Sequence, residues 1–500
     1  MALFMSIRLE AQPGTGVLKV NNLEGSVASN GLLFDSAGTA MLRTKAGMVL
    51  ANRAGIWISA RETSGNIIVS THDVLGTSHE FSPGPLELSG IAPDPSLWNR
   101  VYPISKTEID FHKANYKKDG YTASANILNW PGSSDPPYAK ILAPFVDFQV
   151  NNQKYEPLSG DYPYIVSDAM IYSISNDRYS NSDPMGIEVH TSLFGFAKDS
   201  ALENCILARY TVHNRSGKDY SNFRLSSVIN FRIGNTENEF LGTDVSHKTL
   251  FAVNDTGEAT FSNKLVSMGC MLLNGRISST MYFNNNSDPI SGRPVSDQDY
   301  YFLMQGRWKS GKQLTYFGNG VDGSIPARYI YPYTSDASHG DTLWSEESTL
   351  NLPGSRFGLV NTDSTVLKNG EAKKYDFVYF FVEKNNYNVK QIGDFCSKIK
   401  GALASKNLLE TRSEDDVRRR VISCFPNPAE SGEKLGILNA PETALYIRLL
   451  TMDGKEICKL DLDINNNLIN LPLYLNSGLY MIEFKTLNMT QYNKLLINNH

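Results

Sequence analysis

Four stretches near the C-terminus decide the fold of that end of the chain: SCFPNPAESGEKLGI (423–437), LYIRLLTMDGKEICKLDLDI (445–464), INLPLYLNSGLYMIEFKT (469–486) and YNKLLINNH (492–500). In the second stretch Leu445, Ile447 and Leu449 occupy alternate positions, which is the period of a strand with one buried face. Asp453-Gly454 then supplies a two-residue hairpin turn, and further alternating stretches follow it. The pattern predicts a small antiparallel β-sandwich.

Four landmarks occur in order along these stretches: Phe425-Pro426-Asn427-Pro428, Asp453-Gly454-Lys455, Leu475-Asn476-Ser477-Gly478-Leu479-Tyr480 and Lys494-Leu495-Leu496-Ile497. With them the region resembles the C-terminal sorting domain (type A) of the type IX secretion system of Bacteroidota. The alternative is an Ig-like module that serves packing alone.

The resemblance implies a cargo that crosses the outer membrane from the periplasm and is then secreted or attached to the outer face of that membrane. The implied partners are the type IX translocon and its outer-membrane shuttle components, with surface lipopolysaccharide or glycans as possible anchors. The residues that would carry the sorting signal are Phe425, Pro426, Asn427, Pro428, Asp453, Gly454, Gly478, Tyr480 and Lys494.

Composition limits the class of protein. The 500 residues hold 47 Lys and Arg against 52 Asp and Glu, a net charge of −5, with 41% hydrophobic residues. A nucleic-acid partner is not expected, because binding to phosphates depends on clustered positive charge. The longest apolar run, 377–382, is far shorter than a bilayer span, so no transmembrane segment is expected.

The region before the sorting stretch is predicted to be mostly strands. Apolar or alternating runs occur at 55–58, 67–69, 187–190, 206–212 and 375–382. Two helices interrupt them: 107–117, with Thr107 as its cap, and 389–405, with a periodic apolar face. The predicted fold class is therefore all-β, a large multi-sheet β-sandwich with two short helices followed by a small C-terminal Ig-like β-sandwich.

These patterns predict four segments. Residues 1–12 are a signal-peptide remnant or a disordered N-terminus, and 13–410 are the β-sandwich cargo region, as one body or two subdomains. Residues 411–424 form a charged linker and 425–500 the sorting domain.

Residues 20–385 also resemble a large family of secreted Bacteroidota proteins that carry this sorting domain. The resemblance rests on a series of short motifs, among them Gly55-Ile56-Trp57-Ile58, Leu142-Ala143-Pro144-Phe145-Val146-Asp147, Gly160-Asp161-Tyr162-Pro163 and Asn214-Arg215-Ser216-Gly217. It implies a location and an architecture, and it implies no reaction.

One polar loop is a candidate calcium site. Asp147, Asn151, Glu156 and Asp161 supply oxygen ligands within one loop, as calcium sites require. The loop lacks the turn glycine of such sites and its spacing is off by one, so two interpretations stay open. Either the loop binds Ca²⁺ weakly, or its polar groups cap the backbone by hydrogen bonds. No other cofactor is expected.

Catalytic motifs are sparse. The sequence contains no HExxH, no GxSxG and no phosphate-binding glycine loop, and its eight histidines are scattered. The five cysteines form no CxxC pair, and Cys205 and Cys396, which have apolar neighbours, are expected to be buried thiols. His190 is expected to be a packed or surface imidazole rather than a base. We assign no catalytic residue from the sequence.

Aromatic residues are the remaining candidates for a binding site. Trp308, Tyr329, Tyr331 and Tyr333 could present flat faces to sugar rings or to a partner protein; the alternative is that they are half-buried strand residues. The sequence therefore favours a secreted or cell-surface protein that acts by binding, adhesion or structure. The competing hypothesis is a secreted hydrolase acting on polysaccharide or peptide, and a Ser/His/Asp cluster or two facing carboxylates within 14–410 would favour it.

Overall fold

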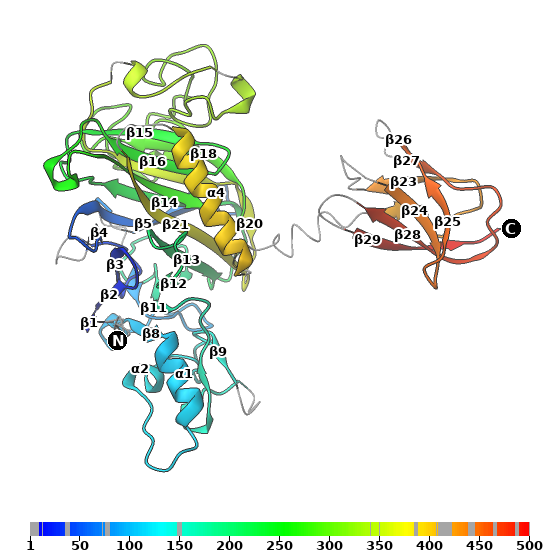
Figure 1. Ribbon diagram of the computed structural model, residues 1–500, viewed down its shortest axis with the longest axis horizontal. Helices are drawn as coiled ribbons and strands as arrows, with labels where there is room; N and C mark the ends of the chain where they lie inside the picture. Colours follow the sequence, from blue (N-terminus) through cyan, green and yellow to red (C-terminus); the bar gives the residue numbers. More distant parts are fainter. Residues whose placement is uncertain are drawn as a thin grey trace. The chain divides into compact units, whose positions relative to one another are not determined.

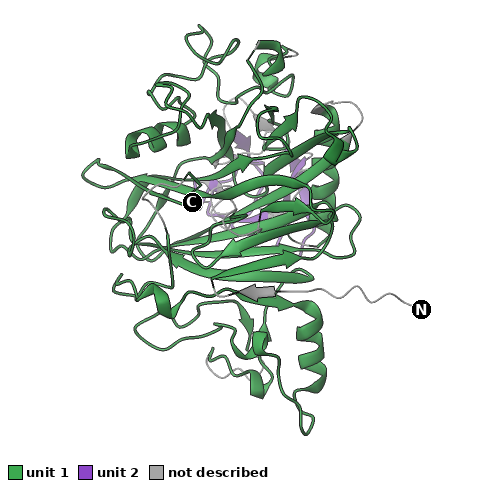
Figure 2. Ribbon diagram, turned by 90° about the vertical axis from the view of Figure 1, so that its left-hand side faces the viewer, with its two compact units in different colours: residues 1–409 green, residues 410–500 purple. Residues whose placement is uncertain are grey.

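The computed structural model describes residues 10–12, 14–35, 41–72, 74–75, 81–147, 153–340, 342–349, 351–384, 389–406, 408, 423–438, 446–463, 468–485 and 490–499. The chain divides into two compact units, residues 1–409 and residues 410–500, shown in green and purple in Figure 2. Each unit is described separately below.

Two large antiparallel sheets build the first unit (Figure 1). Ten described strands form one sheet: β1 (Glu10–Gln12), β2 (Thr15–Lys19), β3 (Leu23–Ala28), β4 (Leu42–Thr44), β5 (Val49–Arg61), β14 (Tyr220–Phe231), β19 (Phe357–Thr362) and β18 (Ile277–Phe283) in this order, with β6 (Ile67–Thr71) beside β5 and β20 (Thr365–Leu367) beside β14. Nine form the other: β15 (Glu239–Asp244), β16 (Thr249–Asn254), β17 (Leu265–Leu272), β21 (Ala372–Lys384), β13 (Cys205–Asn214), β12 (Ile187–Gly195), β11 (Ala169–Asn176) and β7 (Ser82–Pro83), with β8 (Tyr102–Ser105) beside β11. A small sheet pairs β9 (Phe145–Val146) with β10 (Tyr162–Pro163).

The main hydrophobic core lies between the two large sheets. Ile56 of β5 and Val228 of β14 belong to the same buried cluster as Val189 of β12 and Ala208 of β13. Because side chains alternate along a strand, every second residue of each sheet faces this core. Across it, the hydroxyl groups of Ser227 and Tyr379 lie 2.9 Å apart. The first unit is therefore a β-sandwich.

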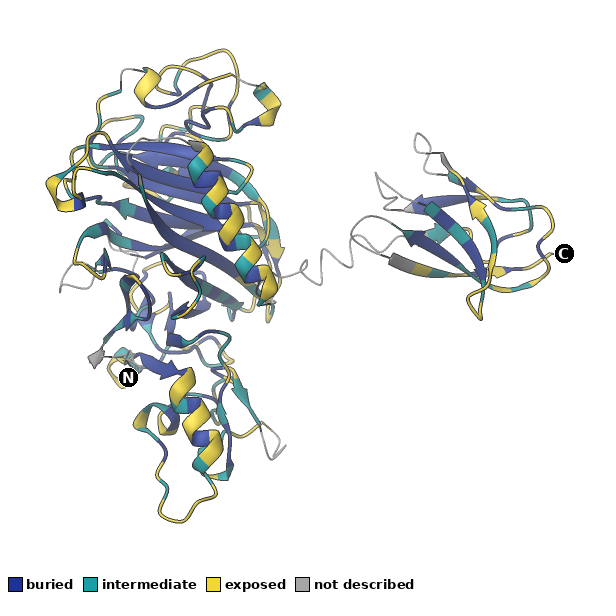
Figure 3. Ribbon diagram, viewed as in Figure 1, coloured by how far each residue is buried: buried dark blue, intermediate teal, exposed yellow. Residues whose placement is uncertain are grey.

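Helices cover the outer face of the nine-stranded sheet. Figure 1 shows α4 (Val389–Ser405) lying across this sheet, and Figure 3 shows its exposed outer side above buried strands. Its apolar residues at 392, 396, 399 and 403 are buried in a second core with Val378 and Phe380 of β21. The i, i+4, i+7, i+11 spacing explains why one side of the helix is buried and the other is open.

Two shorter helices, α1 (Lys106–Asn115) and α2 (Ala125–Leu128), contribute to the same second core. Ser105 caps α1, because its hydroxyl accepts the N–H of Glu108 at 3.2 Å while the Glu108 carboxylate accepts the N–H of Ser105 at 3.1 Å. The sequence pattern placed the cap at Thr107, two residues too late. Of the side chains expected to pack, Ile109 is buried and Phe111 is 61% exposed.

The connection from β18 to β19 packs on the outer face of the ten-stranded sheet. It contains α3 (Asp297–Met304), which Ser296 caps by accepting the N–H of Asp299 at 3.3 Å. Tyr300 of α3 meets Trp57 of β5 edge-on at a ring separation of 4.7 Å. Further along the connection, Trp308 and Trp344 are buried in the same hydrophobic cluster as Ile56 and Val228, so this long excursion extends the main core.

The second unit is a smaller sandwich of two four-stranded sheets. One contains β22 (Ser423–Phe425), β23 (Lys434–Leu438), β27 (Leu468–Asn470) and β26 (Leu462–Asp463), and the other β25 (Glu456–Leu460), β24 (Tyr446–Thr451), β28 (Gly478–Lys485) and β29 (Thr490–Ile497). Ile437 and Ile469 of the first sheet are buried together with Leu449, Ile482 and Phe484 of the second.

The expected fold class, all-β with a large and a small sandwich, is confirmed. The strands expected from apolar runs lie in β5, β6, β12, β13 and β21, and the helix expected at 389–405 is α4. The helices α2 and α3 were missed, because each is too short for the helical period to stand out.

Candidate active site

The β15–β16 hairpin positions an aspartate and a histidine side by side. Asp244 ends β15, and His247 lies in the four-residue turn that leads to β16. The turn is closed by a hydrogen bond from the N–H of Lys248 to the carbonyl of Val245 at 3.1 Å. Asp244 is buried, and its Oδ1 accepts the N–H of His247 at 3.2 Å. This backbone hydrogen bond holds the carboxylate in place independently of its contact with the imidazole.

Helix α4 brings a serine to this pair. Its apolar side packs on the sheet, so Gly393 and Ser397 face the hairpin. A Cβ on Gly393 would lie 3.0 Å from Oδ2 of Asp244 and 3.3 Å from Cε1 of His247. Both distances are tighter than ordinary contacts, so the close approach of α4 to the hairpin depends on glycine at this position.

A continuous hydrogen-bonded chain links the three side chains. Oδ2 of Asp244 lies 2.7 Å from Nδ1 of His247, and Nε2 of His247 lies 2.9 Å from Oγ of Ser397. Because a carboxylate accepts hydrogen bonds, Nδ1 carries the proton and Nε2 accepts the serine O–H. This is the arrangement of a nucleophile, a general base and the acid that orients the base.

The serine opens into a pocket of about 790 Å³. Residues of the hairpin, of α4 and of the 333–347 segment line it, including Asp244, His247, Tyr333, Leu343, Lys390 and Ser397. Ser397 is exposed, whereas the side chain of His247 is 21% exposed and that of Asp244 is 5% exposed. The nucleophile is thus open to a ligand, and the groups behind it are shielded.

Burial also decides which neighbouring groups can react. Cys396, next to Ser397, is fully buried, and burial raises the pKa of its thiol to about 12. It stays protonated at neutral pH and is no competing nucleophile. Burial lowers the pKa of Lys400, one turn of α4 beyond Cys396.

A negative charge that forms on a substrate carbonyl needs hydrogen-bond donors. The N–H of Ser397 lies within α4 and is used by the helix, so it cannot serve. Among the described residues, the side chains with N–H or O–H groups that line the pocket include Ser246 and Thr334. Hydroxyl groups of this kind are candidates to stabilise an oxyanion.

The loop expected to bind calcium uses its oxygens internally. Asp147 accepts a backbone N–H of the same loop at 2.9 Å, and the buried Asp161 accepts the N–H of Glu156 at 2.8 Å. Glu156 also forms an ion pair with Lys154 at 2.9 Å. Asn151 lies outside the described residues. These bonds are of the kind that the capped-loop alternative requires, and the calcium site stays a prediction.

The four aromatic candidates occupy different environments. Trp308 is fully buried and its Nε1 donates to the carbonyl of Gly320 at 2.8 Å, and Tyr331 is also fully buried. Tyr329 is half-buried. Tyr333 is among the residues that line the pocket with Ser397, but it is buried and its hydroxyl donates to Glu347 at 2.8 Å. A ligand-facing role for these residues therefore stays a prediction.

Sequence reasoning missed all three residues of the hydrogen-bonded chain. Asp244 and His247 are three apart, a spacing typical of a turn, and Ser397 follows 150 residues later. Only the packing of α4 against the β15–β16 hairpin brings Ser397 to them. No local motif signals such a site.

Three of the residues expected to carry the sorting signal have structural roles in the second unit. Asn427 joins the first and last segments, because its Nδ2 donates to the carbonyl of Lys494 at 2.8 Å and its Oδ1 accepts the N–H of Leu496 at 2.9 Å. Gly454 closes the β24–β25 turn with φ of +86°, a conformation that favours glycine. The hydroxyl of Tyr480 donates to the carbonyl of Asn476 at 2.9 Å.

A comparison with known protein families matches residues 423–498 to the secretion system C-terminal sorting domain. Residues 423–498 are a type IX sorting domain. The chain is therefore cargo of type IX secretion in Bacteroidota, secreted or attached to the cell surface, and the sorting domain interacts with the secretion machinery. The membership of residues 20–385 in a family of such cargo stays a prediction.

No curated protein matches the chain. Among the solved structures that match is a polysaccharide lyase, at 10% identity and a TM-score of 0.20. The match covers 66% of this chain and spans 39% of that protein, and at this TM-score it supports no conclusion on fold or activity. Among the described residues, no helix has the length and hydrophobicity of a membrane span.

Proposed function

We propose that the first unit is a secreted serine hydrolase that cleaves carboxylic esters, including acyl groups carried by polysaccharides. The observation that supports this is the hydrogen-bonded chain from Asp244 through His247 to Ser397, with the serine open to the pocket. This is the Ser/His/Asp cluster by which a hydrolase would be distinguished from a binding protein.

The reaction follows from the geometry. Oγ of Ser397 attacks the carbonyl carbon while Nε2 of His247 takes the serine proton, and Asp244 stabilises the imidazolium that results. The imidazolium then returns its proton to the leaving alcohol, which departs and leaves an acyl group on Ser397. Water, deprotonated by His247, then attacks the acyl carbon; the bond to Oγ of Ser397 breaks, the imidazolium returns its proton to Oγ, and the carboxylic acid is released.

The second candidate is a protein that binds a ligand in the same pocket without chemistry. It is favoured by the position of Ser397 within α4, which removes its N–H from the set of oxyanion donors. Under this alternative Tyr333 and the polar side chains of the pocket would recognise the ligand.

The sorting domain also leads to proposals about the partners of export and the final location of the protein. We infer that the second unit contacts the type IX translocon and its outer-membrane shuttle components, and that the cargo is released or attached to lipopolysaccharide on the outer face of the outer membrane. Adhesion to glycans belongs to the binding alternative. Extraction of the mature protein together with lipopolysaccharide from the cell surface would support attachment, and recovery from the medium alone would contradict it.

Kinetics with a chromogenic ester distinguish the two functions. Purified full chain should hydrolyse p-nitrophenyl acetate, and Ser397→Ala and His247→Ala should each lower kcat/KM by at least about 10³-fold. Ser405→Ala on the same helix is the matched control, since Ser405 bonds within the helix to the carbonyl of Ala402. Equal rates for the native chain and Ser397→Ala would overturn the hydrolase and leave the binding function.

A further inference from the structure

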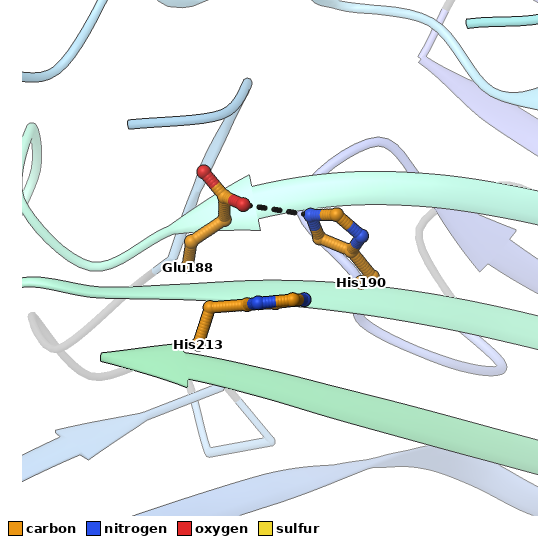
Figure 4. A group of neighbouring side chains, drawn as sticks. All are labelled: Glu188, His190 and His213. Atoms are coloured by element: carbon orange, nitrogen blue, oxygen red, sulfur yellow. Dashed lines mark hydrogen bonds and ion pairs between the residues drawn. The ribbon is translucent and has the colours of Figure 1, made fainter. Parts of the chain in front are cut away.

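A second constellation lies on the nine-stranded sheet, and none of its members lines the pocket around Ser397. Glu188 and His190 alternate along β12 and therefore project from the same side of the sheet. His213 of β13 is paired directly opposite Glu188. Figure 4 shows the three side chains of these two strands lying close to one another.

The donor atoms of this cluster are close enough to share one ion. One carboxylate oxygen and one ring nitrogen from each histidine all lie within 4.8 Å of one another. Glu188 is fully buried and His190 is 7% exposed. A buried carboxylate beside two imidazoles is the ligand set that divalent transition metals prefer.

His190 is held between Tyr172 and Glu188. The Tyr172 hydroxyl lies 2.6 Å from Nδ1 of His190 and 2.9 Å from the carbonyl of Leu142. Nε2 of His190 lies 2.8 Å from Oε1 of Glu188, so one proton lies between these two atoms. A metal ion that binds both atoms takes the place of that proton.

The surroundings are suited to a metal. Oε2 of Glu188 accepts the N–H of Leu86 at 2.7 Å, which fixes the carboxylate. The ring of His213 lies 4.5 Å from that of His190. Tyr172 orients His190 as outer partners of metal-binding histidines do.

We propose that Glu188, His190 and His213 bind one divalent transition-metal ion of the zinc type, with a water molecule completing the coordination. In a tetrahedral zinc site, ligand atoms lie roughly 3.3 Å apart, given bonds of about 2.0–2.1 Å. The pair Oε1 and Nε2, now 2.8 Å apart, therefore opens by about 0.5 Å when the ion replaces the proton. The site is independent of the hydrolase proposed above.

One neighbouring charge opposes the ion. Nη2 of Arg215 lies 3.4 Å from Oε1 of Glu188 and competes for the same oxygen. Removing this positive charge with Arg215→Gln should tighten metal binding by at least about tenfold, because two like charges in a partly buried site repel strongly. A purely structural Glu188–His190 pair would bind no metal in either variant.

Titration of the full chain with Zn²⁺ after chelator treatment tests the proposal. We expect one ion per chain, and a visible absorption band with Co²⁺ that reports nitrogen ligands. Glu188→Gln and His213→Ala should abolish binding, and Tyr172→Phe should weaken it by about 10–100-fold. His339→Gln is the matched control, since His339 stacks on Tyr316 in another part of the unit.

The outcomes separate clearly. Absence of stoichiometric Zn²⁺ binding by the folded native chain would overturn the proposal, and so would binding that His213→Ala leaves unchanged. If Glu188→Gln fails to fold, His213→Ala and the tighter binding of Arg215→Gln still decide the question. Ser397→Ala should bind Zn²⁺ like the native chain, so failure of the hydrolase and failure of the metal site are distinguishable.

Discussion

Acid should destabilise the first unit through His72, a histidine in the core between the two large sheets. His72 is 1% exposed and follows β6. Its Nδ1 accepts the N–H of Ile56 at 3.0 Å, so Nε2 carries the proton and donates to the carbonyl of Asn30 at 2.9 Å. Protonation of Nδ1 would break the first bond and bury a charge.

The magnitude follows from the pKa. Burial lowers the pKa of His72 from 6.5 to about 4. Because the unfolded chain binds the proton first, the contribution of His72 to stability is complete above pH 6.5 and is lost as pH falls toward 4. At about 1.4 kcal/mol per pKa unit the whole loss is roughly 3 kcal/mol, of which about 2 kcal/mol falls between pH 7 and pH 5.

Tryptophan fluorescence isolates this effect. All five tryptophans lie in the first unit, so urea unfolding followed by their emission reports on that unit alone. The free energy of unfolding should fall between pH 7 and pH 5 by about 2 kcal/mol more in the native chain than in His72→Gln, which cannot titrate there. Parallel pH profiles for the two chains would refute the assigned burial and hydrogen bonding of His72.

Three further predictions follow from the site, the core and the second unit. Gly393→Ala should lower ester hydrolysis at least about tenfold by pushing α4 away from Asp244 and His247. The helix propensity of alanine, about 1 kcal/mol better than that of glycine, offsets part of the steric cost in Tm. Native kinetics in this variant would contradict the close packing. Burial raises the pKa of Glu239 from 4.5 to about 8, so the first unit loses stability as pH rises through that range. Glu239→Gln should therefore raise the free energy of unfolding at pH 7 by about 1–3 kcal/mol. A lower free energy of unfolding in this variant would show that the carboxyl group is ionised in the fold. Deleting residues 423–500 should leave the cargo in the periplasm, and surface delivery of the truncated chain would refute the role of the sorting domain.

Much of the fold could be predicted because its signals are local. The strand at 206–212 and the helix at 389–405 show their periods directly in the sequence, and both are observed. The cap of α1 was misplaced although the sequence carries its signal, because the Ser105-x-x-Glu108 spacing is that of a capping box and Thr107 was chosen instead. The order of strands in the sheets could not be predicted, since it depends on contacts between distant segments.

In the candidate sites, too, local spacing could be predicted from the sequence and contacts between distant segments could not. Glu188 and His190 share one side of a strand, which their i, i+2 spacing indicates, but His213 joins them only through the register of β12 with β13. Ser397 reaches His247 across 150 residues, through packing alone. The burial of single side chains could not be predicted either. Trp308 is of a residue type that is common in binding sites, but it lies in the core.

Labelling with a fluorophosphonate tests the central claim most directly, because the reagent forms a bond only with a serine that a neighbouring base activates. The native chain should gain one adduct, and peptide mapping should place it on Ser397, with no labelling of Ser397→Ala or His247→Ala and full labelling of Ser405→Ala. An unlabelled native chain, or an adduct that persists in His247→Ala, would contradict an active site built from Asp244, His247 and Ser397.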